Sequence, residues 1–166
     1  MYGQGFCNLR LYQLLQARKR PNHPGCVCVS ESERGDNQAY FEDTAFGNTN
    51  SMWDYFDEVS KGALNIEGNI YGPYTLDGDA ADYSSGSSFV RDSVEIADDD
   101  IYYPDYDAVV AIHSGPGGES SGNSNDIWSA HWPTLTISTD DEDENGDDHF
   151  VDGISQVPEY QLSNGE

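Results

Sequence analysis

The chain has 166 residues, enough for one domain of ordinary size with a core of its own. Its formal net charge is −24, from 31 carboxylates against seven Lys and Arg, and a surface of this charge repels phosphate backbones, which excludes nucleic acid as a partner. No run of residues approaches the roughly 20 apolar ones of a membrane span, and 12% aromatic residues argue against wholesale disorder.

The charge changes sign along the chain. Residues 1–30 contain four basic residues and no acid, whereas residues 31–166 carry all 31 acids and sum to −28. The apolar stretch of residues 9–17 is interrupted by Arg and Gln, so it fits a secretion signal poorly. We expect residues 1–30 to be a poorly ordered or non-native basic leader and residues 31–166 to form the domain. The leader holds all the cysteines, Cys7, Cys26 and Cys28.

Two short helices are predicted after the charge break. Residues 40–46 place apolar side chains three to five apart and end at Gly47, which is typical of a helix followed by a C-cap. Ser51 is placed to N-cap a second helix over residues 52–60, because Asp54 follows it by three positions as in a capping box. We expect this second helix to bury Trp53, Phe56 and Val59.

The next elements alternate between strand and helix patterns. From residue 63 to residue 71 the apolar period changes to two, which predicts a strand that leads into a Gly72-Pro73 turn. A polar loop over residues 77–88 precedes a short amphipathic helix of residues 89–97. Because carboxylates at a helix C-terminus oppose the helix dipole, we expect a cation or high ionic strength to offset the three that follow, Asp98, Asp99 and Asp100.

The second half of the chain is predicted to supply most of the sheet. Residues 106–112 form the most apolar stretch, which predicts a central strand buried on both faces. Residues 134–138 alternate and predict a further strand, for which residues 151–157 are the candidate hairpin partner. The expected fold is α+β, a small mixed sheet with two or three packed helices.

One acidic segment matches the template of a calcium-binding loop. Oxygen-bearing side chains occupy its first, third and fifth positions, Gly146 is sixth, and an acid is twelfth. Calcium prefers six to eight hard oxygen ligands, which such a loop can gather. In a chain this acidic, a solvated acidic hairpin is the alternative interpretation. The candidate ligands are Asp141, Asp143, Asn145, Asp147 and Asp152.

A second motif, G-x-S-x-G, occurs at residues 118–122 and would make Ser120 a candidate nucleophile. That motif needs a strand directly before it and a helix directly after it, whereas the sequence predicts a loop on both sides. A serine hydrolase is therefore the third functional hypothesis. In the following segment, we expect Trp128 and Trp132 to pin a loop to the core. His113 and His131 have no helical spacing to another histidine, so we expect structural or surface roles for them.

Several segments resemble one known family, in the same order along the chain. They are YFEDTAFG at residues 40–47, SMWDYFDEVSKGALNIEG at 51–68, YGPYT at 71–75, VVAIHSGPGGE at 109–119, DIWSAHW at 126–132, and VDG with VPEY between 151 and 160. Together they resemble the secreted immune inhibitor A-like metallopeptidases. The resemblance implies a zincin-like catalytic domain, an extracellular location, and a peptide or protein as substrate.

In that family a zinc-binding H-E-x-x-H helix follows the VPEY segment, and this chain contains no H-E-x-x-H. The resemblance therefore implies part of a zincin-like domain with no zinc ligand, no catalytic residue and no activity as this chain alone. The alternative function is a non-catalytic, acidic, calcium-binding extracellular module. The excess of acids also predicts a halophilic protein whose folded fraction rises with salt, because salt screens the self-repulsion.

Overall fold

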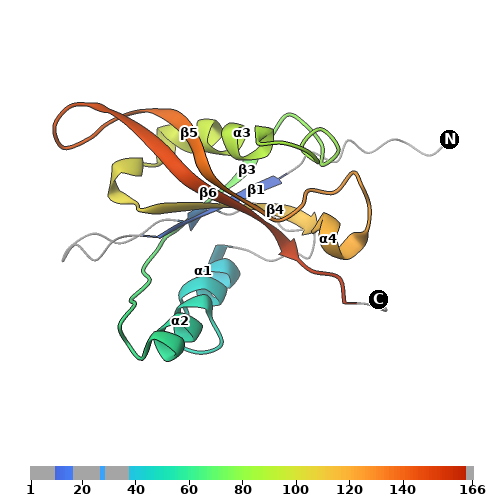
Figure 1. The fold of residues 1–166 in the computed structure, drawn as a ribbon, viewed down its shortest axis with the longest axis horizontal. Coiled ribbons are helices and arrows are strands. Elements are labelled where there is room, and N and C mark those ends of the chain that lie inside the picture. The colour runs from blue at the N-terminus through green and yellow to red at the C-terminus, as the bar shows by residue number, and fades with distance from the viewer. Residues whose placement is uncertain (1–9, 17–26, 29–37, 164–166) are drawn as a thin grey trace.

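A mixed sheet of six strands forms the centre of the computed structural model, which describes residues 10–16, 27–28 and 38–163 (Figure 1). The order of the strands across the sheet is β2-β3-β1-β4-β6-β5. β5 is the last strand in this order and therefore an edge strand of the described sheet. β4 and β6 are parallel, and β5 runs antiparallel to β6. The strands are β1 (Arg10–Gln16), β2 (Val27–Cys28), β3 (Ile70–Thr75), β4 (Ala108–Pro116), β5 (Ala130–Glu142) and β6 (Asp148–Tyr160).

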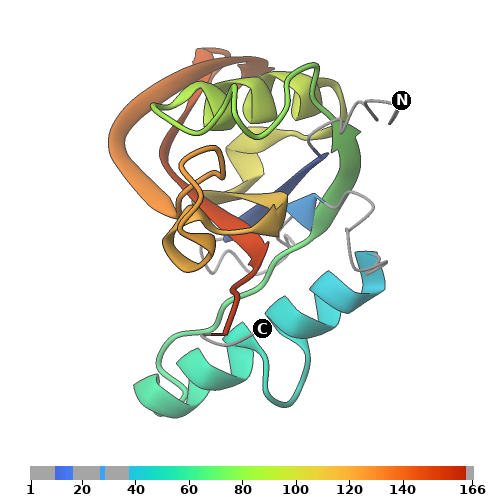
Figure 2. The same cartoon turned by 90° about the vertical axis from the view of Figure 1, so that its right-hand side faces the viewer.

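Helices lie on both sides of this sheet, which confirms the predicted α+β class (Figures 1 and 2). α3 (Ser88–Ala97) covers one face, while α1 (Gln38–Phe46) and α2 (Met52–Ser60) lie on the other. A four-residue helix, α4 (Gly118–Ser121), follows β4. Two 3-10 turns, η1 (Asp98–Asp100) and η2 (Tyr103–Asp105), connect α3 to β4. No helix in the described ranges is long and apolar enough to cross a membrane.

The larger hydrophobic core lies between α3 and the sheet. Phe89, Val90 and Val94 of α3 are fully buried there against Ala111 of β4 and Ile154 of β6. Burial of a side chain of this size contributes roughly 1.5–3 kcal/mol, so α3 is a main source of stability. A smaller cluster on the opposite face joins α1 to β3.

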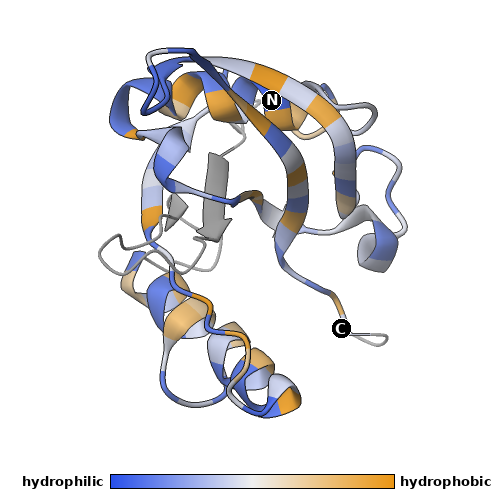
Figure 3. Ribbon diagram, turned by 60° about the vertical axis from the view of Figure 1, so that its left-hand side comes forward, coloured by the Kyte–Doolittle hydropathy of each residue, from blue (hydrophilic) through white to orange (hydrophobic). Residues whose placement is uncertain are grey.

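The predicted helix boundaries near residue 51 are confirmed, but the predicted burial is wrong. Ser51 Oγ accepts the Asp54 N–H at 3.0 Å, and the Asp54 carboxylate accepts the Asn50 N–H at 2.8 Å. α2 has no buried residue, Trp53 and Phe56 are only half-buried, and Val59 is 55% exposed. The reason is that α2 packs against α1 and stands away from the sheet (Figure 2); of its hydrophobic residues, coloured orange in Figure 3, Met52 at its start packs against the smaller cluster.

The strand predicted from residue 63 begins later than expected. β3 starts at Ile70, and Gly72 and Pro73 lie inside it instead of forming a turn. The register between β1 and β3 shifts opposite these two residues. An irregularity of this kind accommodates a proline, which has no N–H to give to the ladder.

The later strands follow the prediction closely. β4 is central, between β1 and β6, as expected. Its residues alternate between buried and half-buried, so only one face is fully covered, and the prediction of two buried faces is wrong. β5 and β6 form the predicted hairpin, with Ile137 opposite Val151, and each strand is 13 residues long.

Two features were not predicted from the sequence: the strands β1 and β2, and the hydrogen bonds of the aspartates after α3. β1 and β2 come from the predicted leader, and β1 lies between β3 and β4; the rest of residues 1–30 lies outside the described residues. Two of the three aspartates after α3 accept hydrogen bonds: Asp98 accepts the Asp140 N–H at 2.9 Å, and Asp100 accepts the Tyr74 hydroxyl at 2.8 Å. Such charge-assisted bonds offset the unfavourable helix dipole.

Candidate functional site

Three of the five predicted calcium ligands share the hairpin turn between β5 and β6. The Asp143 carboxylate accepts the N–H groups of Asn145, at 2.8 Å, and Asp147, at 3.1 Å. These hydrogen bonds hold the pKa of Asp143 below its usual range. Gly146 has a φ of 81°, the left-handed conformation that glycine adopts without strain and that this tight turn requires.

The other two predicted ligands lie elsewhere. Asp141 is turned toward η2, where its carboxylate accepts the Tyr103 N–H at 2.8 Å. Asp152 pairs with Thr136 in the middle of the hairpin. It lies four residues along β6 from Asp148, where the turn ends, and four residues of a strand span about 13 Å. The described residues contain no group of three His, Cys, Asp or Glu that could hold a metal ion. Calcium binding by the loop therefore stays a prediction.

Three of the segments behind the family resemblance, at residues 109–119, 126–132 and 151–160, meet at one end of the sheet near Glu119 of α4. The Glu119 carboxylate accepts the N–H of Ser129 at 3.1 Å and the side-chain amide of Gln161 at 2.5 Å, and also accepts the Ser129 hydroxyl. Partial burial raises the pKa of Glu119, but these hydrogen bonds outweigh it and bring the pKa to about 2. Glu119 thus stays ionised and ties α4 to the loop before β5 and to the segment after β6.

Two further contacts close this end of the sheet. A Cβ added at Gly118 would lie 2.5 Å from the Trp128 ring, so only glycine fits beneath the indole as it stands. The Gly115 N–H donates to the Glu159 carboxylate at 3.1 Å, which joins the end of β4 to β6.

Ser120 is held by the backbone. β4 continues to Pro116 and α4 begins at Gly118, so the strand and helix lie closer to the motif than the sequence predicted. The Ser120 hydroxyl donates to the Gly117 carbonyl oxygen and accepts the Leu162 N–H, both at 3.0 Å. Both bonds go to backbone groups, so this hydroxyl anchors the segment after β6. Neither bond joins it to a side chain that could act as a general base.

The loop before β5 is anchored differently from the prediction. Ile127 is fully buried in the core, whereas Trp128 is 53% exposed. Trp132 is half-buried and donates its indole N–H to the Gln156 side chain at 3.3 Å. The isoleucine therefore holds this loop against the sheet, and the expected anchoring by Trp128 is wrong.

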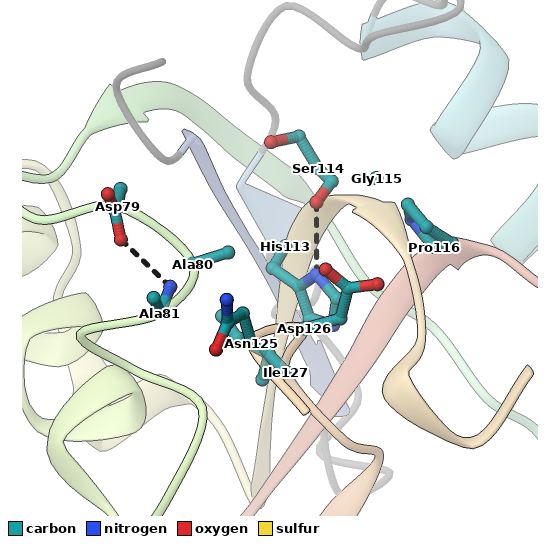
Figure 4. A pocket seen from close by; sticks show the side chains of 10 residues that line it. All are labelled: Asp79, Ala80, Ala81, His113, Ser114, Gly115, Pro116, Asn125, Asp126 and Ile127. Carbon is teal, nitrogen blue, oxygen red and sulfur yellow. Dashed lines mark hydrogen bonds between the residues drawn. The ribbon is translucent and has the colours of Figure 1, made fainter. Parts of the chain in front are cut away.

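The two histidines occupy different environments. His131 is exposed, and its Nδ1 lies 3.0 Å from the Ser155 hydroxyl. His113 is only 1% exposed and forms the floor of a cavity of about 290 Å³ (Figure 4). In the sequence, His113 falls on the same face of its strand as the apolar residues Val109 and Ala111. This alternation could have identified it as a buried histidine. The cavity is lined by Asp79, Ala80, Ala81, His113, Ser114, Gly115, Pro116, Asn125, Asp126 and Ile127.

No model of a protein family matches the chain, and no curated protein or solved structure matches it either.

Proposed function

We propose that this chain is the substrate-holding part of a secreted zinc endopeptidase, with β5 as the strand that binds an extended peptide. The observation that carries the proposal is the outer edge of β5, which pairs with β6 alone among the described residues and starts directly after the loop held by Glu119. The segments that resemble the metallopeptidase family supply both this loop and the strands beside it. A sheet edge of this kind can take a peptide as one more strand, through main-chain hydrogen bonds.

β5 is the last strand in the order of the sheet, and only part of it is engaged by the rest of the described chain. Pro133 lies inside it, between Trp132 and Thr136, where the register with β6 shifts, and a proline has no N–H to give to a ladder. Its end near the hairpin is engaged by the rest of the chain: Asp140 donates its N–H to Asp98, and the Glu142 carbonyl oxygen accepts the Tyr102 hydroxyl at 2.8 Å. We therefore place the peptide along the other part of the strand, residues 130–139.

The residues present do not fit a catalytic zinc. The chain has no H-E-x-x-H, and no cluster of three metal-ligating side chains occurs in the part that the structure describes. We assign no catalytic residue to this chain and derive no step of hydrolysis from it. Its contribution to proteolysis is to hold the substrate, and the metal-binding part is supplied by sequence outside it.

Hydrogen exchange tests the peptide-binding edge. An unstructured casein peptide is added at increasing concentration, and we expect slower exchange within residues 130–139. The matched control is the same peptide with methylated backbone nitrogens, which cannot pair as a strand and should leave exchange unchanged. Equal effects of both peptides, or no slowing within β5, would contradict the proposal. The family assignment is tested separately by translating the genomic DNA after the codon for Glu166 in all frames, where we expect H-E-x-x-H.

A further inference from the structure

His113, which lines the cavity, has a buried hydrogen-bonding atom with which no described residue pairs. His113 points inward from β4, and its ring packs edge-on against Phe89 of α3, with ring centres 5.8 Å apart at 90°. Among the described residues, His113 Nε2 is buried and has no hydrogen-bond partner. An unpaired buried polar atom costs about 1–3 kcal/mol, so a ligand that pairs with it gains affinity.

The hydrogen bond of the other ring nitrogen fixes what this atom can do. His113 Nδ1 lies 3.0 Å from the Ser114 carbonyl oxygen (Figure 4), and a carbonyl oxygen only accepts, so Nδ1 carries the proton. Burial lowers the pKa of His113, which keeps the ring neutral near pH 7. In a neutral ring with a proton on Nδ1, Nε2 is a bare acceptor. The matching ligand must therefore bring a hydrogen-bond donor.

The surroundings favour a donor that is also positively charged. Two carboxylates, Asp79 and Asp126, lie in the wall, and none of the described lining residues is a Lys or Arg. Glu119 and Glu159 lie near enough for their charge to act on the His113 ring. In Figure 4 the loop with Asp79 lies to the left of the His113 ring, and the Asp126 side chain overlaps the ring in this view. A cation in the cavity meets the negative charge of both carboxylates.

The volume of the cavity and its apolar lining residues limit which ligand fits. Ala80, Ala81, Pro116 and Ile127 offer apolar surface beside the carboxylates. A volume of about 290 Å³ is at the small end for ligand sites, which suits a single short side chain or a small metabolite. A metal ion is not favoured, because the described residues supply no three ligating side chains together.

We propose that the His113 cavity binds a small organic cation, an ammonium or guanidinium group on a short aliphatic stem, that donates a hydrogen bond to His113 Nε2. Asp79 and Asp126 balance the charge of the cation, and the alanines, Pro116 and Ile127 contact its stem. This site is separate from the β5 edge and does not depend on the proposed proteolytic function.

Agmatine is a suitable probe because it carries both groups on a four-carbon stem. It is titrated at pH 7.5 into the chain labelled with ¹⁵N in histidine, and we expect the His113 Nε2 resonance to move as the site fills. Tetramethylammonium, a cation with no N–H donor, should bind at least about tenfold more weakly, since a hydrogen bond to a charged group is absent. Equal binding of the two cations, or agmatine binding that moves only the His131 and His149 resonances, would overturn the proposal.

Variants separate the cavity from general attraction by the acidic surface. His113→Phe keeps an aromatic ring against Phe89 and removes the acceptor. We therefore expect the variant to bind agmatine at least about tenfold more weakly. Asp126→Asn should weaken binding several-fold, whereas Asp152→Asn, an exposed carboxylate outside the cavity, should change it by less than about twofold. If the two Asp variants behave alike, the attraction is non-specific and the site is refuted, and this comparison stands even if His113→Phe does not fold.

Discussion

Replacement of Ile127 by alanine tests what holds the loop before β5 in place. Ile127 is fully buried in the core cluster with Phe89, and its carbonyl oxygen accepts the Gly118 N–H at 2.9 Å. Removing a buried isoleucine side chain to the β-carbon costs about 2–5 kcal/mol, the sum of lost burial and of the cavity left behind. Against a typical total of about 5–15 kcal/mol, this is a large loss of stability.

The matched control is Trp128→Ala at the next position. Because Trp128 is 53% exposed, we expect it to cost about 1 kcal/mol or less despite the larger side chain. Urea unfolding at molar salt, followed by far-ultraviolet circular dichroism, gives both free energies of unfolding without relying on tryptophan fluorescence. A cost for Trp128→Ala equal to or above that for Ile127→Ala would refute the assignment of Ile127 as the anchor.

Four further outcomes are expected. The folded fraction should rise from dilute buffer to molar salt, where the Debye length is about 3 Å, and a flat circular-dichroism response would refute the halophilic character. The pKa of Glu119 is about 2 in the folded chain against 4.5 in its ordinary state, so its stabilisation is present above pH 4.5 and is lost as the pH falls from 4.5 toward 2; Glu119→Gln should flatten this part of a stability–pH curve. If the acidic loop binds calcium, millimolar calcium should raise the melting temperature beyond the effect of ionic strength, and Asp143→Asn should abolish the rise; no rise would remove the calcium-binding module. A fluorophosphonate probe should leave Ser120 unlabelled, and labelling there would favour the serine hydrolase.

Local patterns predicted α1, α2, α3 and most strands correctly, because their causes lie within a few residues, whereas α4 lies in a segment predicted to be a loop. The N-cap at Ser51 and the alternation before Ser138 depend on neighbours in sequence, and the structure contains both features. The burial of α2 was mispredicted because its apolar spacing does not say whether a sheet lies opposite. β1 was missed because a short mixed segment gains its strand conformation from β3 and β4, which follow it much later in the chain.

The candidate sites show the same division. The template of the acidic loop predicted the turn around Asp143, but a template cannot tell that Asp152 continues along β6 and leaves the turn. The cavity at His113 was missed, because it is formed by loops near residues 79–81 and 125–127 that only the fold brings together. The histidine was visible in the sequence, but its unpaired nitrogen was not.

The exposed edge of β5 has a consequence for how concentrated solutions of this protein behave. The outer edge of such a strand can pair with the same edge of a second copy, which is the first step of aggregation. Asp140, Asp141 and Glu142 at one end of the strand repel their counterparts on another copy, and in dilute buffer this keeps molecules apart. Screening by salt weakens that repulsion together with the repulsion inside each molecule. The salt conditions that we predict to favour folding of a single chain are therefore also those in which two chains most readily associate through this edge.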